Sequence, residues 1–144
     1  MITRQAIINE ARTWIGTKWQ HQASLKGVAC DCVGLLRGTL GNLTGEKYIE
    51  NVDYPATWHL FKKEEQLYNN MAMYTKEIPK EEMLPGDLIL FGFGKGPAHH
   101  CGILATPTTF IHSWADIGKV VETRLDDFWT KHIRKVMRHP EVID

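Results

Sequence analysis

Apolar residues recur at helical spacing in the first half of the chain and alternate at strand spacing in the second half. Thr3 is a helix-capping type, and Gly16 is a helix-stopping type. Between them the sequence predicts a helix with an apolar face formed by Ala6, Ile7, Ala11, Trp14 and Ile15. Residues 16–29 have few apolar positions and are predicted to be a loop.

Two further helices are predicted before the period changes. The first begins near Cys32, ends between Gly41 and Gly45, and has an apolar pattern formed by Val33, Leu35, Leu36 and Leu40. The second runs from about 57 to 74, with an apolar face formed by Leu60, Leu67, Met71 and Tyr74. The first half of the chain is therefore predicted to be mainly helical.

From Ile78 onward the spacing favours strands. The turn at 84–87 leads into a strand at 88–93, and a loop at 92–97 follows. Further strands are predicted at 100–105, 109–114, 119–122 and 133–138, with a short helix within 125–132. Helices followed by an antiparallel sheet indicate an α+β fold, and 144 residues without repeats or a linker indicate one domain, 1–144.

The charge balance excludes some classes of partner. Seventeen basic and seventeen acidic side chains give a formal charge of zero, which argues against a nucleic-acid or anionic-membrane surface. The chain has no apolar run of about 18 residues and no basic segment leading into an apolar run at its start. We therefore expect a protein made in the cytoplasm without a Sec signal and without membrane insertion.

The three cysteines are expected to be thiols, because their number is odd and Cys30 lies too close to Cys32 for an easy bridge. Cys32 follows Asp31, a good N-cap type, so its sulfur is predicted to lie near unpaired backbone N–H groups in a first helical turn. That position favours the thiolate, which is the nucleophilic form. Cys32 is then either a nucleophile or a small buried hydrophobe.

Two histidines are predicted to lie on one face of a hairpin. If the turn is centred near Thr106, His100 and His112 are equidistant from it and directly opposed, while His99 and Cys101 point to the other face. In that arrangement Cys32 would attack a carbonyl carbon, His100 would move the proton, and His112 would orient His100. The backbone N–H of Cys32 would be the oxyanion donor.

Three ordered motifs resemble the NlpC-type cysteine peptidases of bacterial cell-wall turnover, within the papain-like group. They are the nucleophile motif at 31–35, the strand-entry motif at 85–91, and the two-histidine hairpin formed by 100–104 and 110–113. The resemblance implies a papain-like α+β fold, with Cys32 as nucleophile, His100 as base and His112 as the orienting member. It also implies no cofactor, no metal, and peptidoglycan or a muropeptide as substrate.

Within the family, residues 16–32 look most like the branch found in phage tail and gene-transfer-agent clusters. This implies an enzyme incorporated into a phage-tail-like assembly and acting at the cell wall, which would also account for the missing Sec signal. The resemblance places Trp19, Asp31 and Val33 at the substrate. Trp19 stands where the family commonly has tyrosine, and Val33 where it often has serine.

Three other interpretations remain open. Cys30, Cys32, Cys101 and either His99 or His100 are suitable Zn²⁺ ligand types, although Cys-x-Cys is tighter than the usual spacing. The chain could be a structural tail component that does not catalyse. It could also be an amidase or acyltransferase, or a deamidating or thioester-cleaving enzyme, using the same covalent chemistry on another substrate.

Overall fold

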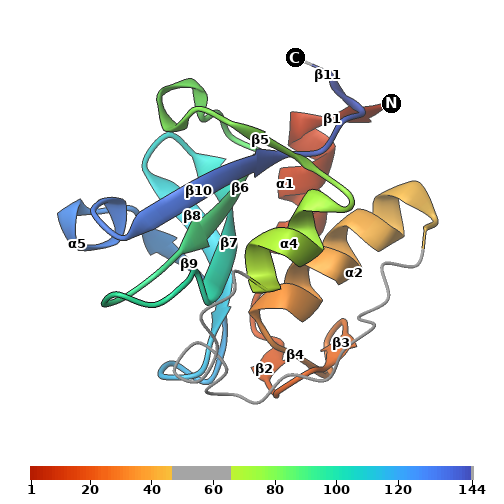
Figure 1. Cartoon of the computed structure of the whole chain (residues 1–144). Helices are drawn as coiled ribbons and strands as arrows, with labels where there is room; N and C mark the ends of the chain where they lie inside the picture. The colour runs from red at the N-terminus through yellow and green to blue at the C-terminus, as the bar shows by residue number, and fades with distance from the viewer. Residues whose placement is uncertain (47–65, 144) are drawn as a thin grey trace.

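A mostly antiparallel sheet with its longer helices packed on one face organises the protein (Figure 1). The computed structural model describes residues 1–46 and 66–143. In the described part the helices are α1 (Arg4–Arg12), α2 (Cys32–Thr44), α4 (Gln66–Ala72), α5 (Asp127–Thr130) and the 3-10 turn η1 (Lys80–Glu82). The α+β fold predicted from the sequence is confirmed.

The main sheet has the strand order β3-β4-β2-β9-β8-β7-β6-β10-β5. Its strands are β2 (Lys18–Trp19), β3 (Ser24–Leu25), β4 (Ala29–Cys30), β5 (Lys76–Ile78), β6 (Leu88–Phe91), β7 (His100–Thr106), β8 (Thr109–Trp114), β9 (Lys119–Arg124) and β10 (Ile133–Arg138). A separate parallel pair joins β1 (Ile2–Thr3) to β11 (Val142–Ile143), so the two ends of the chain lie side by side (Figure 1). The sequence analysis did not predict this pair.

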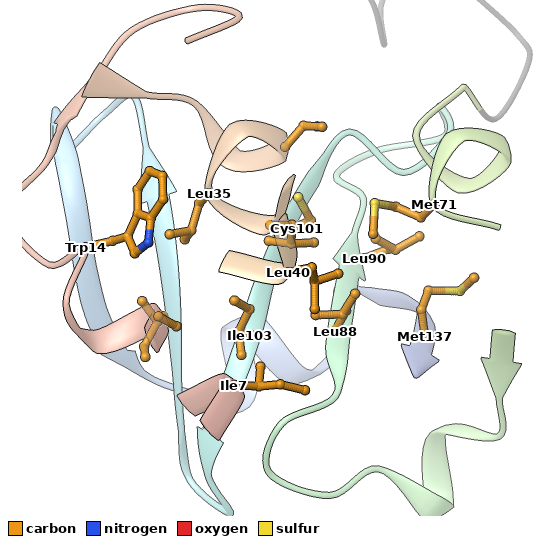
Figure 2. Close-up of a cluster of buried hydrophobic side chains, with 14 of the residues drawn as sticks. Ile7, Trp14, Leu35, Leu40, Met71, Leu88, Leu90, Cys101, Ile103 and Met137 are labelled. Carbon is orange, nitrogen blue, oxygen red and sulfur yellow. The ribbon is translucent and has the colours of Figure 1, made fainter. Parts of the chain in front are cut away.

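Alternate residues of each central strand enter different cores. Leu88 and Leu90 of β6 belong to the cluster beneath α1, α2 and α4 (Figure 2), whereas Ile89 and Phe91 pack on the opposite face with Trp129 of α5. Both faces of β6 are therefore buried, which is why the sequence of this strand is continuously apolar.

The first helix is shorter than the sequence predicted. The Thr3 side chain caps it by accepting a hydrogen bond from the Ala6 N–H at 3.0 Å, but the helix ends at Arg12, well before Gly16. The chain then continues through turns, which bury Trp14 and leave Ile15 exposed. Thr3 was therefore identified correctly as the start, and the predicted end was wrong.

The second helix was predicted well. Asp31 caps α2, and Gly45 ends it in a left-handed conformation with φ 75° that suits glycine. Of the third predicted helix, α4 covers the last part, with Leu67 and Met71 buried as expected. The remainder, including Leu60, lies outside the described residues.

The segment 16–29, predicted to be a loop, contains the two-residue strands β2 and β3 and the first residue of β4, at one edge of the sheet. β2 pairs in parallel with β4 and antiparallel with β9, and β3 pairs with β4. Strands this short leave almost no periodic signal in the sequence, which explains the error.

The later strands mostly match their predicted positions, and β8 and β10 match fully. The sequence predicted that the strand after β8 would end at Glu122, whereas β9 extends to Arg124. Thr123 lies on this added part of the strand.

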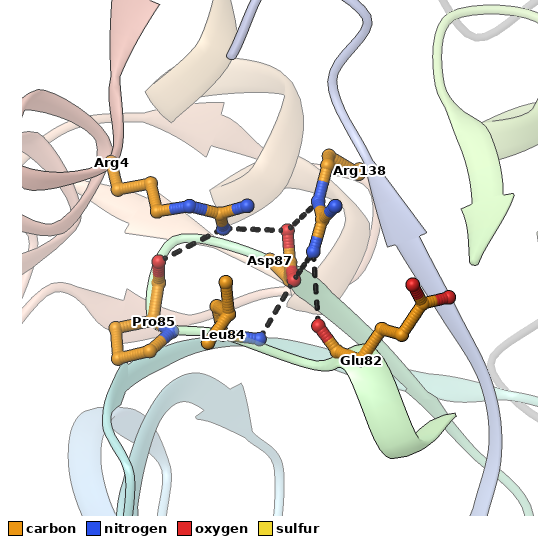
Figure 3. Close-up of polar contacts among 6 residues, drawn as sticks. All are labelled: Arg4, Glu82, Leu84, Pro85, Asp87 and Arg138. Atoms are coloured by element: carbon orange, nitrogen blue, oxygen red, sulfur yellow. Dashed lines mark hydrogen bonds and ion pairs between the residues drawn. The ribbon is translucent and has the colours of Figure 1, made fainter. Parts of the chain in front are cut away.

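A buried carboxylate joins the helical layer to the sheet (Figure 3). Asp87, fully buried at the start of β6, is paired with Arg4 of α1 at 3.0 Å and with Arg138 of β10 at 2.8 Å. The Leu84 N–H donates to the same carboxylate at 2.9 Å, closing the turn before the strand. Asp87 thus connects three segments distant in sequence.

Within the described ranges, no helix has both the length and the apolar character needed to cross a bilayer.

Candidate active site

Cys32 is the first residue of α2, and the cap before it fixes its position. The Asp31 carboxylate accepts hydrogen bonds from the N–H of Gly34 at 2.8 Å and of Gln22 at 2.7 Å. The Ser113 hydroxyl donates to the Cys30 carbonyl at 2.7 Å, which attaches the preceding strand β4 to β8. The half-buried Cys32 is therefore held between a helix start and the sheet.

The two histidines lie on one face of the β7–β8 hairpin, but not directly opposite each other. The register pairs Ile103 with Ile111, then shifts before Thr106 pairs with Thr109. The turn residues are therefore 107 and 108, and the prediction of a turn centred near Thr106 was wrong. The observed pairing of β7 with β8 is shifted by two residues from the predicted pairing, and a shift of two leaves each side chain on the same face of the sheet. His100 and His112 are therefore diagonal neighbours on that face.

This diagonal arrangement joins the imidazoles directly. His100 Nε2 lies 2.7 Å from His112 Nδ1, and the ring centroids are 5.0 Å apart at 69°. His112 Nε2 lies 2.8 Å from the Thr123 hydroxyl on β9. Both nitrogens of His112 are therefore engaged, and Nδ1 of His100 is the ring nitrogen left for Cys32.

Glycine at 102 makes room for this packing. A Cβ added there would lie 2.9 Å from the Phe110 ring and 3.2 Å from the His112 Cβ. These contacts are tighter than a side chain normally accepts, so the ring of Phe110 and the Cβ of His112 can approach β7 because residue 102 has no side chain.

The Cys32 thiol is strongly acidified. Hydrogen bonds from Cys101 and His100, together with the charge of His100, lower the pKa of Cys32 from its ordinary range to about 6. Burial and the Asp31 carboxylate act in the opposite direction. The group is therefore mostly thiolate near neutral pH.

His112 is held neutral. Burial, reinforced by the charge of His100, lowers the pKa of His112 from 6.5 to about 2. Its ring is surrounded by Phe110, Trp114 and Trp129, with centroids 4.3, 5.6 and 5.1 Å away. An imidazole in this apolar enclosure carries one proton and accepts at its other nitrogen.

The other two thiols differ from Cys32. Burial raises the pKa of Cys30 to about 11, so this neighbour remains a thiol. Cys101 is buried in the cluster beneath α2 (Figure 2) and, as predicted, lies on the opposite face of β7 from His100. His100 is the first residue of β7, and Cys32 is the first residue of α2. Cys32 lies at the start of β7, so it contacts both His100 on one face of the strand and Cys101 on the other.

The structure gives two of the three predicted substrate residues other roles. Val33 is 2% exposed and packs in the core, so it is not available to a ligand, and the prediction of a substrate contact there was wrong. The Asp31 carboxylate is buried and occupied by two backbone N–H groups. Trp19 is half-buried on β2, beside the strand that leads to Cys32.

Across the part of the chain that the structure describes, no group of three or more His, Cys, Asp or Glu side chains is arranged to hold a metal ion. Sequence reasoning missed Thr123 and the contact of Cys101 with Cys32. Thr123 becomes visible only from the pairing of β8 with β9. The sequence correctly predicted that Cys101 lies on the face of β7 opposite His100. It did not predict that Cys32 lies at the start of this strand.

Comparison with known proteins supports one family. The family model of NlpC/P60 matches residues 14–138. A Haemophilus influenzae protein named "Probable endopeptidase" is 35% identical over 68 residues, which are 46% of this chain and 42% of that protein. The Escherichia coli "Probable endopeptidase NlpC" is 39% identical over 64 residues, 43% of this chain and 41% of that protein. The similarity thus spans about two fifths of each of these relatives.

Solved structures show the same fold. The NlpC/p60 domain of the peptidoglycan hydrolase SagA aligns with a TM-score of 0.67 at 19% identity, covering 94% of this chain and 97% of that one. An NLP/P60 protein of Staphylococcus aureus aligns with a TM-score of 0.66 at 19% identity, covering 98% of this chain and 42% of that one. The family match and the shared fold lead to one conclusion: the chain belongs to the NlpC/P60 family.

Proposed function

We propose that the protein is a cysteine endopeptidase that hydrolyses amide bonds in the stem peptides of peptidoglycan. The observation that carries the proposal is the acidified Cys32 at a helix start, in contact with a histidine that a second histidine holds at 2.7 Å. Membership of the NlpC/P60 family, which includes proteins named as endopeptidases and as a peptidoglycan hydrolase, supports the choice of substrate.

Acylation follows from the geometry. The Cys32 thiolate attacks the carbonyl carbon, and the negative oxygen that forms is stabilised by the Cys32 backbone N–H, one of the donors without an intrahelical partner at a helix start. The carbon–nitrogen bond then breaks. The His100 imidazolium gives its Nδ1 proton to the leaving amine, which leaves a thioester on Cys32 and a neutral His100.

Deacylation uses the same groups in reverse. Neutral His100 takes a proton from water at Nδ1, and the hydroxide attacks the thioester carbon. The carbon–sulfur bond breaks, releasing a carboxylic acid and restoring the Cys32 thiolate beside the imidazolium. His112 remains neutral throughout because of its pKa of about 2, so it accepts from His100 Nε2 without taking the catalytic proton.

Trp19 is the predicted substrate residue that remains available for contact. It is half-buried, and its backbone N–H is bound to the Gly118 carbonyl at 2.9 Å, so its ring is what it offers to a stem peptide. Asp31 contributes indirectly, because it fixes the helix start that carries Cys32.

The direct test is digestion of purified muropeptides, with the products identified by mass spectrometry. Cys32→Ala and His100→Ala should each lower turnover by about 10³-fold or more, and His112→Ala by less, because His112 does not contact substrate. Cys30→Ala is the matched thiol control and should retain activity.

The outcomes separate this function from its rivals. Wild-type hydrolysis by Cys32→Ala would contradict the mechanism. A Cys32 that alkylates rapidly in a protein that cuts no muropeptide would favour an amidase or acyltransferase of another substrate. A Cys32 no more reactive than Cys30 would favour a tail component without catalysis.

We also propose that the enzyme is carried by a phage tail or gene-transfer-agent particle and opens the wall locally. The resemblance of residues 16–32 to that branch supports this. Immunoblotting of purified particles and of the cytosol of the producing host tests it. Recovery with the particles is expected, and recovery in the cytosol alone would contradict the proposal.

A further inference from the structure

Thr123 lies at the end of a continuous series of polar contacts that begins at Cys32. Its hydroxyl is 2.8 Å from His112 Nε2, and His112 Nδ1 is 2.7 Å from His100 Nε2. Thr123 belongs to β9, whereas His112 and His100 belong to β8 and β7, so the series crosses three adjacent strands.

The placement of protons on the ring nitrogens of this series requires one tautomer of His112. When His100 is an imidazolium beside the Cys32 thiolate, both of its ring nitrogens carry protons. His100 Nε2–H must then donate to a bare His112 Nδ1. Since His112 is neutral, its single proton must be on Nε2.

That Nε2–H requires an acceptor. His112 is fully buried, and the rings around it are Phe110, Trp114 and Trp129, which offer no conventional acceptor because the indole nitrogen only donates. The Thr123 hydroxyl is the side-chain acceptor that the structure places at this nitrogen.

Loss of this hydroxyl would favour the wrong tautomer. A buried Nε2–H without a partner is costly, and moving the proton to Nδ1 removes that cost. The Nδ1–H would then point at His100 Nε2, where it opposes the imidazolium. The thiolate of Cys32 would lose part of its stabilisation, and its pKa would rise.

We propose that Thr123 is a positioning residue that holds His112 in the Nε2–H tautomer and thereby keeps His100 able to carry the catalytic proton. The proposal rests on the proposed function for its catalytic consequence. Its structural part concerns the tautomer of His112 and the acidity of Cys32, and both can be measured without a substrate.

The chain offers variants matched to this role. Thr123→Val keeps the shape of the side chain and removes the hydroxyl, whereas Thr123→Ser keeps the hydroxyl. Thr109→Val is the control, because Thr109 also lies in the sheet, with its hydroxyl at 2.7 Å from Thr106 and 2.8 Å from Glu122 and no hydrogen bond to either histidine.

The first readout is the tautomer of His112 in the wild-type protein, from imidazole nitrogen and carbon chemical shifts by NMR near neutral pH. We expect the proton on Nε2. A proton on Nδ1 would overturn the proposal without any variant.

The second readout is the pH dependence of Cys32 alkylation by iodoacetamide, followed by peptide mapping. Thr123→Val should raise the midpoint by about one pH unit, roughly tenfold in acidity, while Thr123→Ser and Thr109→Val keep the wild-type midpoint. An unchanged midpoint in Thr123→Val, or the same rise in Thr109→Val, would overturn the proposal.

The third readout is muropeptide hydrolysis, where Thr123→Val should lower kcat and leave KM unchanged, with activity restored in Thr123→Ser. A change confined to KM would contradict a positioning role. Because the first two readouts use no substrate, a wrong substrate assignment leaves them unchanged, and failure of the two proposals can be distinguished.

Discussion

Asp31 has two opposed effects on Cys32. Its carboxylate caps α2 and fixes the position of Cys32, yet its charge raises the pKa of the same thiol. Geometry and charge can be separated here, because asparagine caps helices about as well as aspartate without the charge.

We therefore expect Asp31→Asn to shift the midpoint of Cys32 alkylation below that of the wild type. It should also cost about 1 kcal/mol of stability, because the Gln22 N–H loses its acceptor. Alkylation against pH and urea unfolding measure the two effects. A midpoint above the wild-type value would show that the carboxylate favours the thiolate, contrary to this account.

His112 predicts a pH dependence of folding. Its pKa is about 2 in the folded protein against an ordinary 6.5, so only the unfolded chain takes up the proton as the pH falls below 6.5. Stability is therefore fully present above pH 6.5 and is lost progressively toward pH 2.

At pH 4.5 this loss should be on the order of 2–3 kcal/mol relative to pH 7. Urea unfolding at both pH values should show that His112→Asn, which does not titrate, loses less stability over this interval than the wild type. Equal losses in both proteins would show that His112 is not held neutral by the fold.

At this scale, residue type and spacing alone predicted Cys32, His100 and His112 as candidate catalytic residues. The sequence could not indicate Thr123, because that contact depends on the register between β8 and β9 and on a strand that runs past Glu122. Val33 belongs to the apolar pattern of the predicted helix and lies in the core, so the predicted substrate contact came from the family resemblance and not from the hydrophobic pattern.

Among the secondary-structure elements, the packing of α1 and the turns after it against α2 depends on a glycine. A Cβ added at Gly38 would overlap the buried ring of Trp14 and approach the Ser24 hydroxyl to 3.2 Å. The indole also donates to Glu10 at 3.0 Å, which restricts its movement.

We expect Gly38→Ala to destabilise the protein by about 1–3 kcal/mol through overpacking, despite the higher helix propensity of alanine. Thermal unfolding of the variant and the wild type measures this. A Gly38→Ala protein as stable as the wild type would show that Trp14 can move aside.

The hairpin of β7 and β8 shows what periodicity determines and what it leaves undetermined. The alternation of apolar residues placed both strands and put both histidines on one face. The exact pairing of β7 with β8 is set by a two-residue turn and a register shift. Both of these follow from turn chemistry and not from the spacing of apolar residues.

For the whole molecule, Asp87 joins α1, β6 and β10 through a fully buried carboxylate. The sequence identified its turn but could not show its two arginine partners, which lie far away in the chain. Replacing the carboxylate removes two ion pairs whose arginine side chains are only 14% and 18% exposed.

Asp87→Ala should therefore cost about 3–5 kcal/mol in urea unfolding. The matched control is Arg12→Ala, which breaks the more exposed pair with Glu122 and should cost less than about 1 kcal/mol. Equal losses from the two variants would contradict the role assigned to Asp87.

The central claim is that the fold makes Cys32 an activated nucleophile, and the rate of iodoacetamide alkylation against pH tests it most directly. With peptide mapping to separate the three thiols, Cys32 should react with a midpoint near pH 6, while Cys30, whose pKa is raised to about 11, stays unreactive. A Cys32 midpoint near the ordinary value of about 8.5, or a rate no greater than that of Cys30, would contradict the account.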